Sequence, residues 1–597
     1  MALQGRRKTS ARAAMLRSAT LALAVPAASV AAQAPPPVPP QAAPPTREEV
    51  TRPDADLRRD RAIRLEVDAE LERSPCALDT PEFKHVRLTL RGVEFDGLQG
   101  LSGAAMADRY VGLTGTEQPI SIVCEIRDRA AAKLRAAGYI AAVQVPEQKI
   151  TDGTVRFQVV MARLAQVRVR GNANGAERII AAYLNKLSKR PVFNRFEAER
   201  YLLLASDLPG YTVRLTLRPA GTKPGEVLGD VTVQRTPIYS DINIQNGGSK
   251  ILGRWGGFAR AQAFGITGLA DRTTIGVFST ADFSEQTTMQ VGHDFALGDR
   301  GMRAGGMFTY ARARPSIEGP DDLTARTLLS TLQVDYPIVR KLDRTIRGSV
   351  GIDIADQDVD FVGERIARDR LRTAFLRLGI EARGTDFSAD RNPSEPPWRV
   401  YAQADLRKGV DMLGATEPCP AAGCTSGTPQ SRLNGLSTAT VVRTLLQGEY
   451  RPLPKLTFAI AAQAQYSWKP LLSFDQFAAG NYSVGRGYDP GSLLGDRGFG
   501  ARSEIRYGST VPADAKDAAI EGYVFYDWVT VDSVGPPLIA GRDHLASAGI
   551  GARGTYDRFV LDAVLAVPLT RIGFDEKRPD PRLLISVTTR LWPWTYE

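Results

Sequence analysis

Residues 482–507 read YSVGRGYDPGSLLGDRGFGARSEIRY, a glycine-rich stretch late in a chain of 597 residues. The stretch contains six glycines, and its first cation, Arg486, lies between Gly485 and Gly487 just before the aromatic Tyr488. Glycine has no Cβ, so a backbone rich in glycine can turn sharply and pack closely. We therefore expect this stretch to fold back into a narrow compartment that carries the charge of Arg486 at its tip.

An arginine buried in such a compartment needs a carboxylate partner. Asp527 is the best candidate, because it lies in the otherwise aromatic and apolar stretch Tyr523–Trp528, where an unpaired charge would be costly. A glycine-rich hairpin with surface charges remains an alternative. A phosphate-binding loop is disfavoured, because GRGYDPG is not GxGxxG and no Lys-Ser/Thr pair follows it.

The motif VGRGYDPGSLLGDRGFGARSEIRY resembles the loop motif of the two-partner secretion transporters, the haemolysin secretion/activation family of outer-membrane β-barrels. The resemblance implies that the loop tip enters the barrel lumen. Its arginine would there meet the aspartate of an F-x-D motif on the barrel wall, here Phe525 and Asp527. The glycine usual two residues after that aspartate is Val529 in this chain. The lumen-loop motif would comprise Arg486, Gly487, Tyr488, Gly495 and Asp496.

Residues 1–34 have the pattern of a secretory signal peptide. They contain five basic residues and no acidic ones, the apolar run Ala19–Ala28 and the small-x-small sequence Ala32–Ala34. The apolar run is too short to span a membrane as a mature helix. Cleavage would lower the formal net charge from +10 to about +5. That excess is weak evidence for nucleic acid or anionic lipid as a partner, and we predict neither from it.

The four cysteines of an exported chain are expected to be oxidised. Cys419 and Cys424 lie close together in a loop rich in Pro, Gly, Ser and Thr, so they would close a small loop. Cys76 and Cys124 flank the first half of the first expected α/β domain and would form a longer bridge. A metal site is disfavoured, because there is no CxxC and no histidine has metal-ligand spacing to the cysteines. We predict no metal and no cofactor.

Residues 35–75 are expected to form a linker. Its proline-rich start, Pro35–Pro45, is extended and cannot pack a core. The stretch Arg47–Arg73 is dense in charge and helical in part, so a solvated helix is the default interpretation. The resemblance implies that a helix at this position can plug the barrel. The apolar face of this helix is thin and comprises Ile63, Leu65, Val67 and Leu71.

Residues 76–163 predict the first of two small α/β domains. The stretch Val86–Arg91 alternates between apolar and polar residues, as a half-buried strand does. A helix is expected over Ser121–Ala137, with its end at Gly138. Further strands are expected at Tyr139–Val145 and Val155–Val159.

Residues 164–237 repeat this pattern. Asn194–Glu197 reads as a capping box at a helix start. The stretch Glu197–Gly210, EAERYLLLASDLPG, is similar to the second POTRA signature of the same family. The two domains therefore resemble POTRA domains, and without that likeness they would be generic binding modules. The other expected elements are strands at Val167–Gly171, Tyr211–Leu217 and Val231–Val233 and a helix near Ala176–Leu187.

Residues 238–597 change to long strands that alternate between apolar and polar residues. The stretches Lys455–Trp468, Trp398–Arg407 and Arg372–Arg383 show this alternation. Strands of about ten residues with one apolar face are typical of a transmembrane β-barrel, whereas strands of soluble sandwiches have about five or six residues. No mature segment offers about 18 uncharged apolar residues, so helical membrane spans are excluded.

The predicted fold class is a membrane β-barrel of about 16 antiparallel strands, the number that the family implies, preceded by two α/β POTRA domains. The last expected strand, Leu583–Trp592, must pair with the first strand to close the barrel. The resemblance implies an aromatic residue at the C-terminus as an assembly signal, and the chain ends in Glu597 instead. The signal would then be read from Trp592, Trp594 or Tyr596.

The resemblance implies a transporter that secretes an unfolded, haemolysin- or adhesin-like partner exoprotein from the periplasm to the cell surface through its own barrel. It also implies the outer membrane of a Gram-negative bacterium, with its lipid, the barrel-assembly machinery and periplasmic chaperones as partners. Edge strands of POTRA domains can bind an extended client by β-augmentation. Client docking is expected at Leu164, Val167, Val169, Leu208, Pro209 and Gly210.

An insertase of the same superfamily is the alternative, because it shares the Arg/Asp pair. It is disfavoured by the presence of only two POTRA-like domains. A passive porin would not need periplasmic domains at all. The sequence contains no GxSxG, HExxH or P-loop motif, so we predict no enzymatic activity. The small charge excess of the mature chain leads us to predict no nucleic-acid partner.

Overall fold

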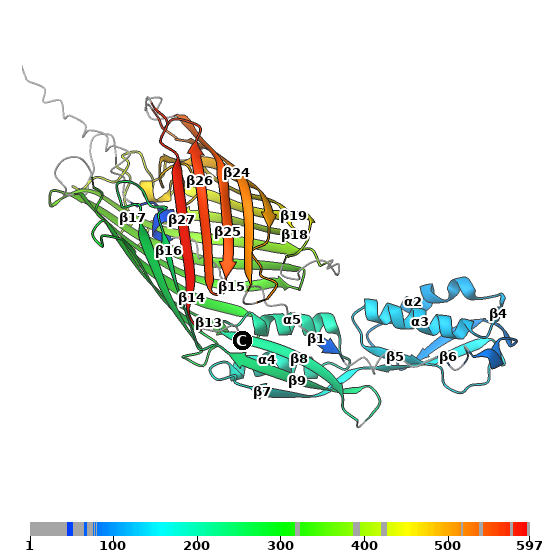
Figure 1. The fold of residues 1–597 in the computed structure, drawn as a ribbon. Helices are drawn as coiled ribbons and strands as arrows, with labels where there is room; N and C mark the ends of the chain where they lie inside the picture. Colours follow the sequence, from blue (N-terminus) through cyan, green and yellow to red (C-terminus); the bar gives the residue numbers. More distant parts are fainter. Residues whose placement is uncertain are drawn as a thin grey trace, which may run out of the picture. The chain divides into compact units, whose positions relative to one another are not determined.

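The computed structural model describes residues 45–51, 65–67, 76, 78, 80–221, 223–316, 323–385, 395–419, 427–514, 517–535, 541–573 and 577–593. The expected signal peptide and the residues Ile63, Leu71, Cys424, Trp594, Tyr596 and Glu597 lie outside this part of the chain. The described residues form two α/β domains and one large barrel (Figure 1).

The barrel is a closed sheet of sixteen antiparallel strands. Strands adjacent in sequence are adjacent in the sheet, and the ring closes where β10 (Ile238–Gln245) pairs with β27 (Arg582–Trp592). This confirms the predicted fold class. The other barrel strands are β11 (Gly256–Phe264), β12 (Arg272–Thr280), β13 (Gln286–Leu297), β14 (Met302–Ala313), β15 (Leu323–Arg340), β16 (Arg344–Phe361), β17 (Glu364–Arg383), β18 (Trp398–Gly409), β19 (Thr440–Leu453), β20 (Leu456–Ser467), β23 (Arg497–Gly508), β24 (Ala518–Asp532), β25 (Arg542–Tyr556) and β26 (Phe559–Pro568).

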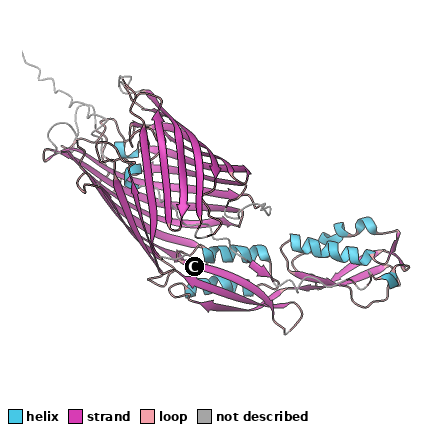
Figure 2. Ribbon diagram, in the orientation of Figure 1, coloured by secondary structure: helices cyan, strands magenta, loops and turns pink. Residues whose placement is uncertain are grey.

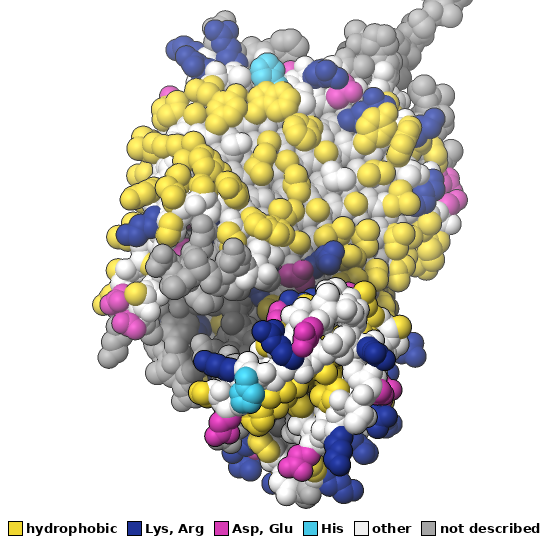
Figure 3. Space-filling model, turned by 90° about the vertical axis from the view of Figure 1, so that its right-hand side faces the viewer, with side chains coloured by type: hydrophobic (Ala, Val, Ile, Leu, Met, Phe, Trp, Pro, Cys, Tyr) yellow, Lys and Arg dark blue, Asp and Glu magenta, His cyan; other side chains and the backbone are white. Residues whose placement is uncertain are grey.

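The barrel strands have an apolar outer face and a polar inner face, because successive side chains of a strand point to opposite sides. On β17, Leu376 and Ile380 are exposed on the outside, whereas Thr373 and Phe375 are buried on the other face. Figure 3 shows the outer residues as a belt of apolar side chains, with charged side chains above and below it. Such a belt fits lipid outside and water inside. In the described part of the chain, no helix is long and apolar enough to cross a membrane.

The first α/β domain has one helix packed on a three-stranded sheet of order β3-β6-β5. Helix α3 (Ile122–Ala136) ends before Gly138, whose φ of 89° lies in the left-handed region that favours glycine. The expected strand Val86–Arg91 is split into two. Its first half is β2 (Arg87–Thr89), which pairs with β4 (Glu117–Pro119) in a separate two-stranded sheet. The main sheet consists of β3 (Gly92–Asp96), β5 (Ala141–Gln144) and β6 (Thr154–Met161).

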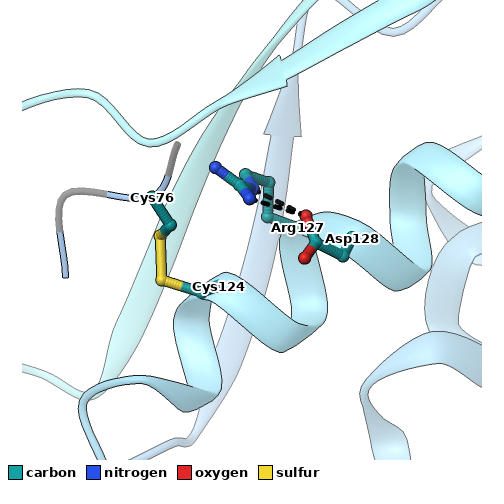
Figure 4. Close-up of a disulfide and its surroundings, with 4 residues drawn as sticks. All are labelled: Cys76, Cys124, Arg127 and Asp128. Carbon is teal, nitrogen blue, oxygen red and sulfur yellow. Dashed lines mark hydrogen bonds and ion pairs between the residues drawn. A yellow bond between two sulfur atoms is a disulfide. The ribbon is translucent and has the colours of Figure 1, made fainter. Parts of the chain in front are cut away.

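A disulfide joins Cys76 to Cys124 in the first turn of α3 (Figure 4). One turn further along the helix, Arg127 pairs with Asp128 at 2.7 Å. Cys419 is also disulfide-bonded. Further short helices in the described residues are α2 (Gly103–Met106), η3 (Pro81–Phe83), η4 (Ala107–Arg109), η5 (Val111–Leu113) and η6 (Ser473–Asp475).

The second α/β domain packs two helices on a four-stranded sheet of order β1-β8-β9-β7 (Figure 2). At the start of the second helix, Asn194 accepts a hydrogen bond from the Phe196 N–H at 2.9 Å, whereas Glu197 pairs with Arg190 at 3.1 Å. Asn194 therefore caps the helix start, but Glu197 is engaged by Arg190 rather than by the reciprocal bond of the expected capping box. The elements are β7 (Arg163–Gly171), α4 (Glu177–Ser188), α5 (Arg195–Ser206), β8 (Tyr211–Pro219) and β9 (Glu226–Arg235).

Strand β1 (Leu65–Val67) corrects the expectation for residues 47–73. This stretch was expected to be helical in part, with a solvated helix as the default, but Leu65–Val67 within it form a strand parallel to β8 at the edge of the second domain's sheet. The physical reason is that the edge of β8 offers unpaired N–H and C=O groups, which an extended segment can satisfy. Within the described residues, the helix α1 spans only Arg47–Thr51.

Candidate functional site

The connection between β20 and β23 folds back against the inner barrel wall. Its two halves pair through β21 (Phe477–Ala479) and β22 (Leu493–Gly495). A Cβ at Gly487 would lie 2.9 Å from Ser547 Cβ and 3.0 Å from Pro568 N, so only glycine fits at this approach to the wall. The expected loop 482–507 is too long, because residues from Arg497 onward form β23 of the wall. The side chains of these residues alternate between the two faces as in the other wall strands, and their backbone pairs with β20 on one side and β24 on the other.

Arg486 lies at the tip of this inward loop and binds Asp527 on β24. Its backbone N–H, Nε and Nη2 donate to the Asp527 carboxylate at 2.9, 3.0 and 2.7 Å. The guanidinium also lies 3.7 Å from the centroid of the Phe525 ring, so the cation contacts an aromatic face as well. The side chain of Asp527 is fully buried. Burial of both partners makes the pair a strong constraint on the position of the loop.

A second carboxylate, Glu504, completes the site and was not predicted. Its Oε1 accepts from Arg486 Nη1 at 2.5 Å, and the residue also pairs with Arg506 and Arg553. Arg553 in turn contacts Asp562 at 3.0 Å. The only sequence signal for Glu504 is its polar position in the alternating pattern of β23, which indicates an inward side chain without naming its partner.

Tyr488 fixes the loop tip to β25 and to the segment that follows β26. Its hydroxyl donates toward the backbone carbonyl of Ala546 at 2.8 Å and accepts from the Thr570 N–H at 2.9 Å. The Tyr488 side chain is almost completely buried and packs in an apolar cluster that includes Val484 and Val529. The motif residues Arg486, Gly487 and Tyr488 therefore act as one unit that holds the loop to β24 and β25.

Val529 stands on β24 where the family pattern has a glycine. A glycine on the neighbouring strand β23 makes room for its side chain. Val529 is paired with Gly500 on β23. A Cβ at Gly500 would lie 3.0 Å from both Val529 Cγ2 and Val484 Cβ. The absence of a side chain at Gly500 therefore gives the Val529 side chain the room it needs, and β24 is continuous through the site.

Asp496 belongs to the same loop but not to the Arg486 cluster. Its carboxylate accepts from Arg432 Nη2 at 3.2 Å, from the Leu471 N–H at 2.8 Å and from the Val534 N–H at 2.7 Å. A Cβ at the neighbouring Gly495 would lie 2.8 Å from the Val531 Cβ. Gly495 and Asp496 therefore anchor the base of the loop, whereas Arg486 anchors its tip.

Asp489 links the loop to the seam where the barrel closes. Its carboxylate accepts from the Lys250 N–H at 2.9 Å and from Arg254 Nη1 at 3.1 Å, on the side of β10 and β11. It also pairs with Arg582 of β27 at 2.9 Å. One carboxylate of the loop thus contacts both sides of the seam.

Helix α1 lies in the lumen, against the inner wall and the connection after β20. Arg47 pairs with Asp353 of β16 at 3.0 Å and with Asp475 of η6 at 2.9 Å. Val50 is buried in a small apolar cluster with Leu472 and Phe474. The Thr46 N–H donates to Glu49 and the Glu49 N–H to Thr46 Oγ1, which caps the helix start.

The expected docking residues fall into two groups. Leu164 and Leu208 are buried in the core of the second domain, and a Cβ at Gly210 would lie 2.5 Å from the Phe264 ring of the barrel. Their side chains therefore stabilise the fold and cannot contact a client directly. Val169 is exposed on β7, which pairs only with β9 within the described part of the chain. Three of the six expected docking residues are buried, two are half-buried and one is exposed. The buried ones are Leu164, Leu208 and Pro209, the half-buried ones are Val167 and Gly210, and the exposed one is Val169.

The closed barrel, its inward loop and the α/β domains before it define a class, the outer-membrane barrels with POTRA domains. Residues 230–554 match the family model for the haemolysin secretion/activation protein ShlB/FhaC/HecB, and residues 88–161 match the model for the ShlB-type POTRA domain. The first match covers more than half of the chain. The chain therefore belongs to this family and is a two-partner secretion transporter of the outer membrane, whose partner is a secreted exoprotein.

Three solved structures share the fold. CdiB from Escherichia coli has a TM-score of 0.69 at 15% identity, covering 87% of this chain and 92% of that chain. CdiB from Acinetobacter baumannii has a TM-score of 0.60 at 16% identity, with coverages of 89% and 94%. BamA from Haemophilus ducreyi lacking POTRA domains 1–3 has a TM-score of 0.50 at 12% identity, with coverages of 85% and 100%. No curated protein sequence matches the chain.

Proposed function

We propose that this transporter captures its partner exoprotein in the periplasm with the open edge of β7, and passes it through the barrel lumen after α1 has left. The α/β domains would lie in the periplasm. Assembly of the barrel would use the barrel-assembly machinery and periplasmic chaperones. The observation that carries the proposal is the position of α1 inside the closed barrel.

Helix α1 is held mostly by polar contacts that a client or water can replace. Besides the Arg47 ion pairs, the amides of Gln357 and Gln290 donate to the carbonyls of Pro45 and Val50, each at 3.3 Å. Breaking a buried ion pair costs about 3–5 kcal/mol. Folding of a client domain outside the cell releases about 5–15 kcal/mol, which is large enough to offset that cost without a nucleotide.

The β7 edge supports capture by backbone pairing. In the second domain's sheet the two edge strands are β1 and β7, and β7, with nine residues against three in β1, is the longer edge that the described residues leave unpaired. An unpaired edge offers N–H and C=O groups to an extended chain with little dependence on side-chain identity. An unfolded exoprotein is a ligand of this kind.

A pair of substitutions at one position tests the capture step. Val169→Pro removes an N–H and bends β7, whereas Val169→Thr keeps a β-branched residue in the strand. We expect secretion to fall by about tenfold or more in the proline variant and to stay unchanged in the threonine variant. Hydrogen exchange of β9 checks that the domain remains folded. Normal secretion by the proline variant would place docking elsewhere.

An insertase would need the seam between β10 and β27 to open. The seam carries side-chain hydrogen bonds in addition to its backbone ladder, since the Asn243 amide donates to Ser586 Oγ at 2.9 Å and to Thr588 Oγ1 at 2.8 Å. These bonds, together with the Asp489 contacts, oppose opening. They support the lumen as the route of the client.

A further inference from the structure

A basic cavity of about 580 Å³ lies between α4 and α5 of the second domain and the nearby turns of the barrel. Five cations line it, and no carboxylate does. Like charges in one cavity repel each other unless an anion enters. The cations are Lys186, Lys189, Arg190, Arg200 and Arg300.

The local partners neutralise only two of these five charges. Lys186 pairs with Asp299 at 2.9 Å and Arg190 with Glu197 at 3.1 Å. The guanidinium of Arg200 donates to a backbone carbonyl, that of Pro337, at 3.0 Å, which leaves its charge uncompensated. Lys189 and Arg300 are exposed, and neither has an ion-pair or hydrogen-bond partner for its side chain within the described residues.

The cavity opens at the rim of the membrane-facing surface. Tyr336, which lines it, is exposed on the outer face of β15, in line with the exposed Leu332 and Ile338. The turn before β14 packs tightly there, because a Cβ at Gly301 would lie 2.5 Å from Leu204 Cδ2 and 2.9 Å from Pro337 Cγ. Aromatic side chains mark the interface level of membrane barrels. The cations therefore lie where the apolar belt ends.

We propose that this cavity binds the phosphate headgroup of an anionic phospholipid from the leaflet on the side of the α/β domains. The acyl chains would lie along the apolar outer face of β15, and the lipid would tie the second domain to the barrel rim. Basic pockets at this level of a membrane protein suit such headgroups. An acidic client segment would match the charge of the cavity, but it would not bury the adjacent apolar side chains Leu332, Tyr336 and Ile338 of β15. This site goes beyond the transport function.

Native mass spectrometry of the full-length protein in detergent, with added phosphatidylglycerol or phosphatidylcholine, tests the proposal. Lys189→Gln with Arg300→Gln removes the two unpaired charges. Each lost cation weakens binding of an anionic lipid about fivefold, so the double variant should bind phosphatidylglycerol about 25-fold more weakly. Lys189→Arg with Arg300→Lys keeps both charges and should bind normally. The matched control is Lys84→Gln with Arg178→Gln, two exposed cations outside the cavity.

The expected result is a selective loss of phosphatidylglycerol in the charge-removing variant alone. Equal binding by that variant and the control would overturn the proposal. Phosphatidylcholine bound as tightly as phosphatidylglycerol would also overturn it. Two further probes identify the source of the anion. Inorganic phosphate or a soluble polyglutamate peptide, bound more tightly than the lipid and lost in the same variant, would assign the cavity to a soluble anion or to an acidic client instead.

Discussion

Arg486 provides every hydrogen bond that Asp527 accepts within the described residues, whereas Asp527 is one of two carboxylates that bind Arg486. Asp527 receives three hydrogen bonds, all from Arg486, and within the described residues no other cation forms a hydrogen bond or ion pair with it, although Arg502 lies opposite it on β23 and interacts with it electrostatically. Arg486 has a second carboxylate, Glu504, at 2.5 Å. Loss of the arginine therefore removes every hydrogen bond and the ion pair of a fully buried carboxylate, whereas loss of the aspartate leaves the arginine with an ion-pair partner.

We therefore predict that Arg486→Ala disturbs the loop more than Asp527→Ala does. A stranded buried charge costs about 3–5 kcal/mol, and the cost is smaller where water enters or a second partner remains. Arg486→Lys should rescue only in part, because an ammonium lacks the fork that grips a carboxylate at two points. Protease resistance of residues 482–495 and secretion are the readouts of a double-mutant cycle. Strictly additive losses would contradict direct coupling of the two residues.

Arg47→Ala should release α1 from the lumen. The change removes the ion pairs with Asp353 and Asp475 and the contact of the guanidinium with the Phe474 ring, 4.8 Å from its centroid. We expect a higher mean conductance in planar bilayers, with more frequent long openings. Thr51→Ala is the control, because Thr51 is exposed at the end of the same helix. Equal conductance of the two variants would show that Arg47 does not hold the helix.

Asp489→Asn should loosen the seam. The amide keeps an acceptor for the Lys250 N–H but loses the charge that pairs with Arg254 and Arg582. A loss of about 1.4 kcal/mol corresponds to tenfold faster exchange of the amides in β27, and an effect of this order is expected. Asp532→Asn is the matched control, since it pairs with Arg497 at 3.6 Å away from the seam. Unchanged exchange in β27 would refute a role for Asp489 there.

Loss of the Cys76–Cys124 bridge should destabilise the first α/β domain. The bridge joins residues 48 positions apart in the sequence. A bridge of this span stabilises a domain by about 2–4 kcal/mol, mainly by restricting the unfolded chain. We expect Cys76→Ser with Cys124→Ser to raise hydrogen exchange in α3, and a reducing agent to act on the native protein in the same way. Barrel exchange should not change in the double cysteine variant.

The sequence was sufficient for the barrel because its alternation is a local signal. Outward Leu376 and inward Thr373 follow directly from the period of two along β17. The tip of the inward loop was predictable for a similar reason, since a lone arginine among glycines needs a buried carboxylate, and Asp527 stands out in an aromatic strand. The end of the loop could not be predicted, because the same glycine-rich motif continues from the inward loop into the wall strand β23.

The other contacts depend on three-dimensional proximity. Glu504 and Arg553 lie on different strands, and nothing in their local sequence indicates that they meet beside Arg486. The edge strand β1 was missed because a charged segment of helical pattern became extended once it met the free edge of β8. The basic cavity was missed because the net charge of the chain is small, and its cations come from helices and turns that are distant in sequence.

The central claim is that the client crosses through the lumen, and site-specific photocrosslinking to a stalled client tests it most directly. Thr331 and Leu332 are neighbours on β15, but the Thr331 hydroxyl donates to the lumenal Asp353 at 2.7 Å, whereas Leu332 is exposed on the outer face. A crosslinker at position 331 should give abundant client adducts, and the same group at position 332 should give none. Adducts at 332, or at Ile244 beside the seam, without adducts at 331 would contradict the lumen route.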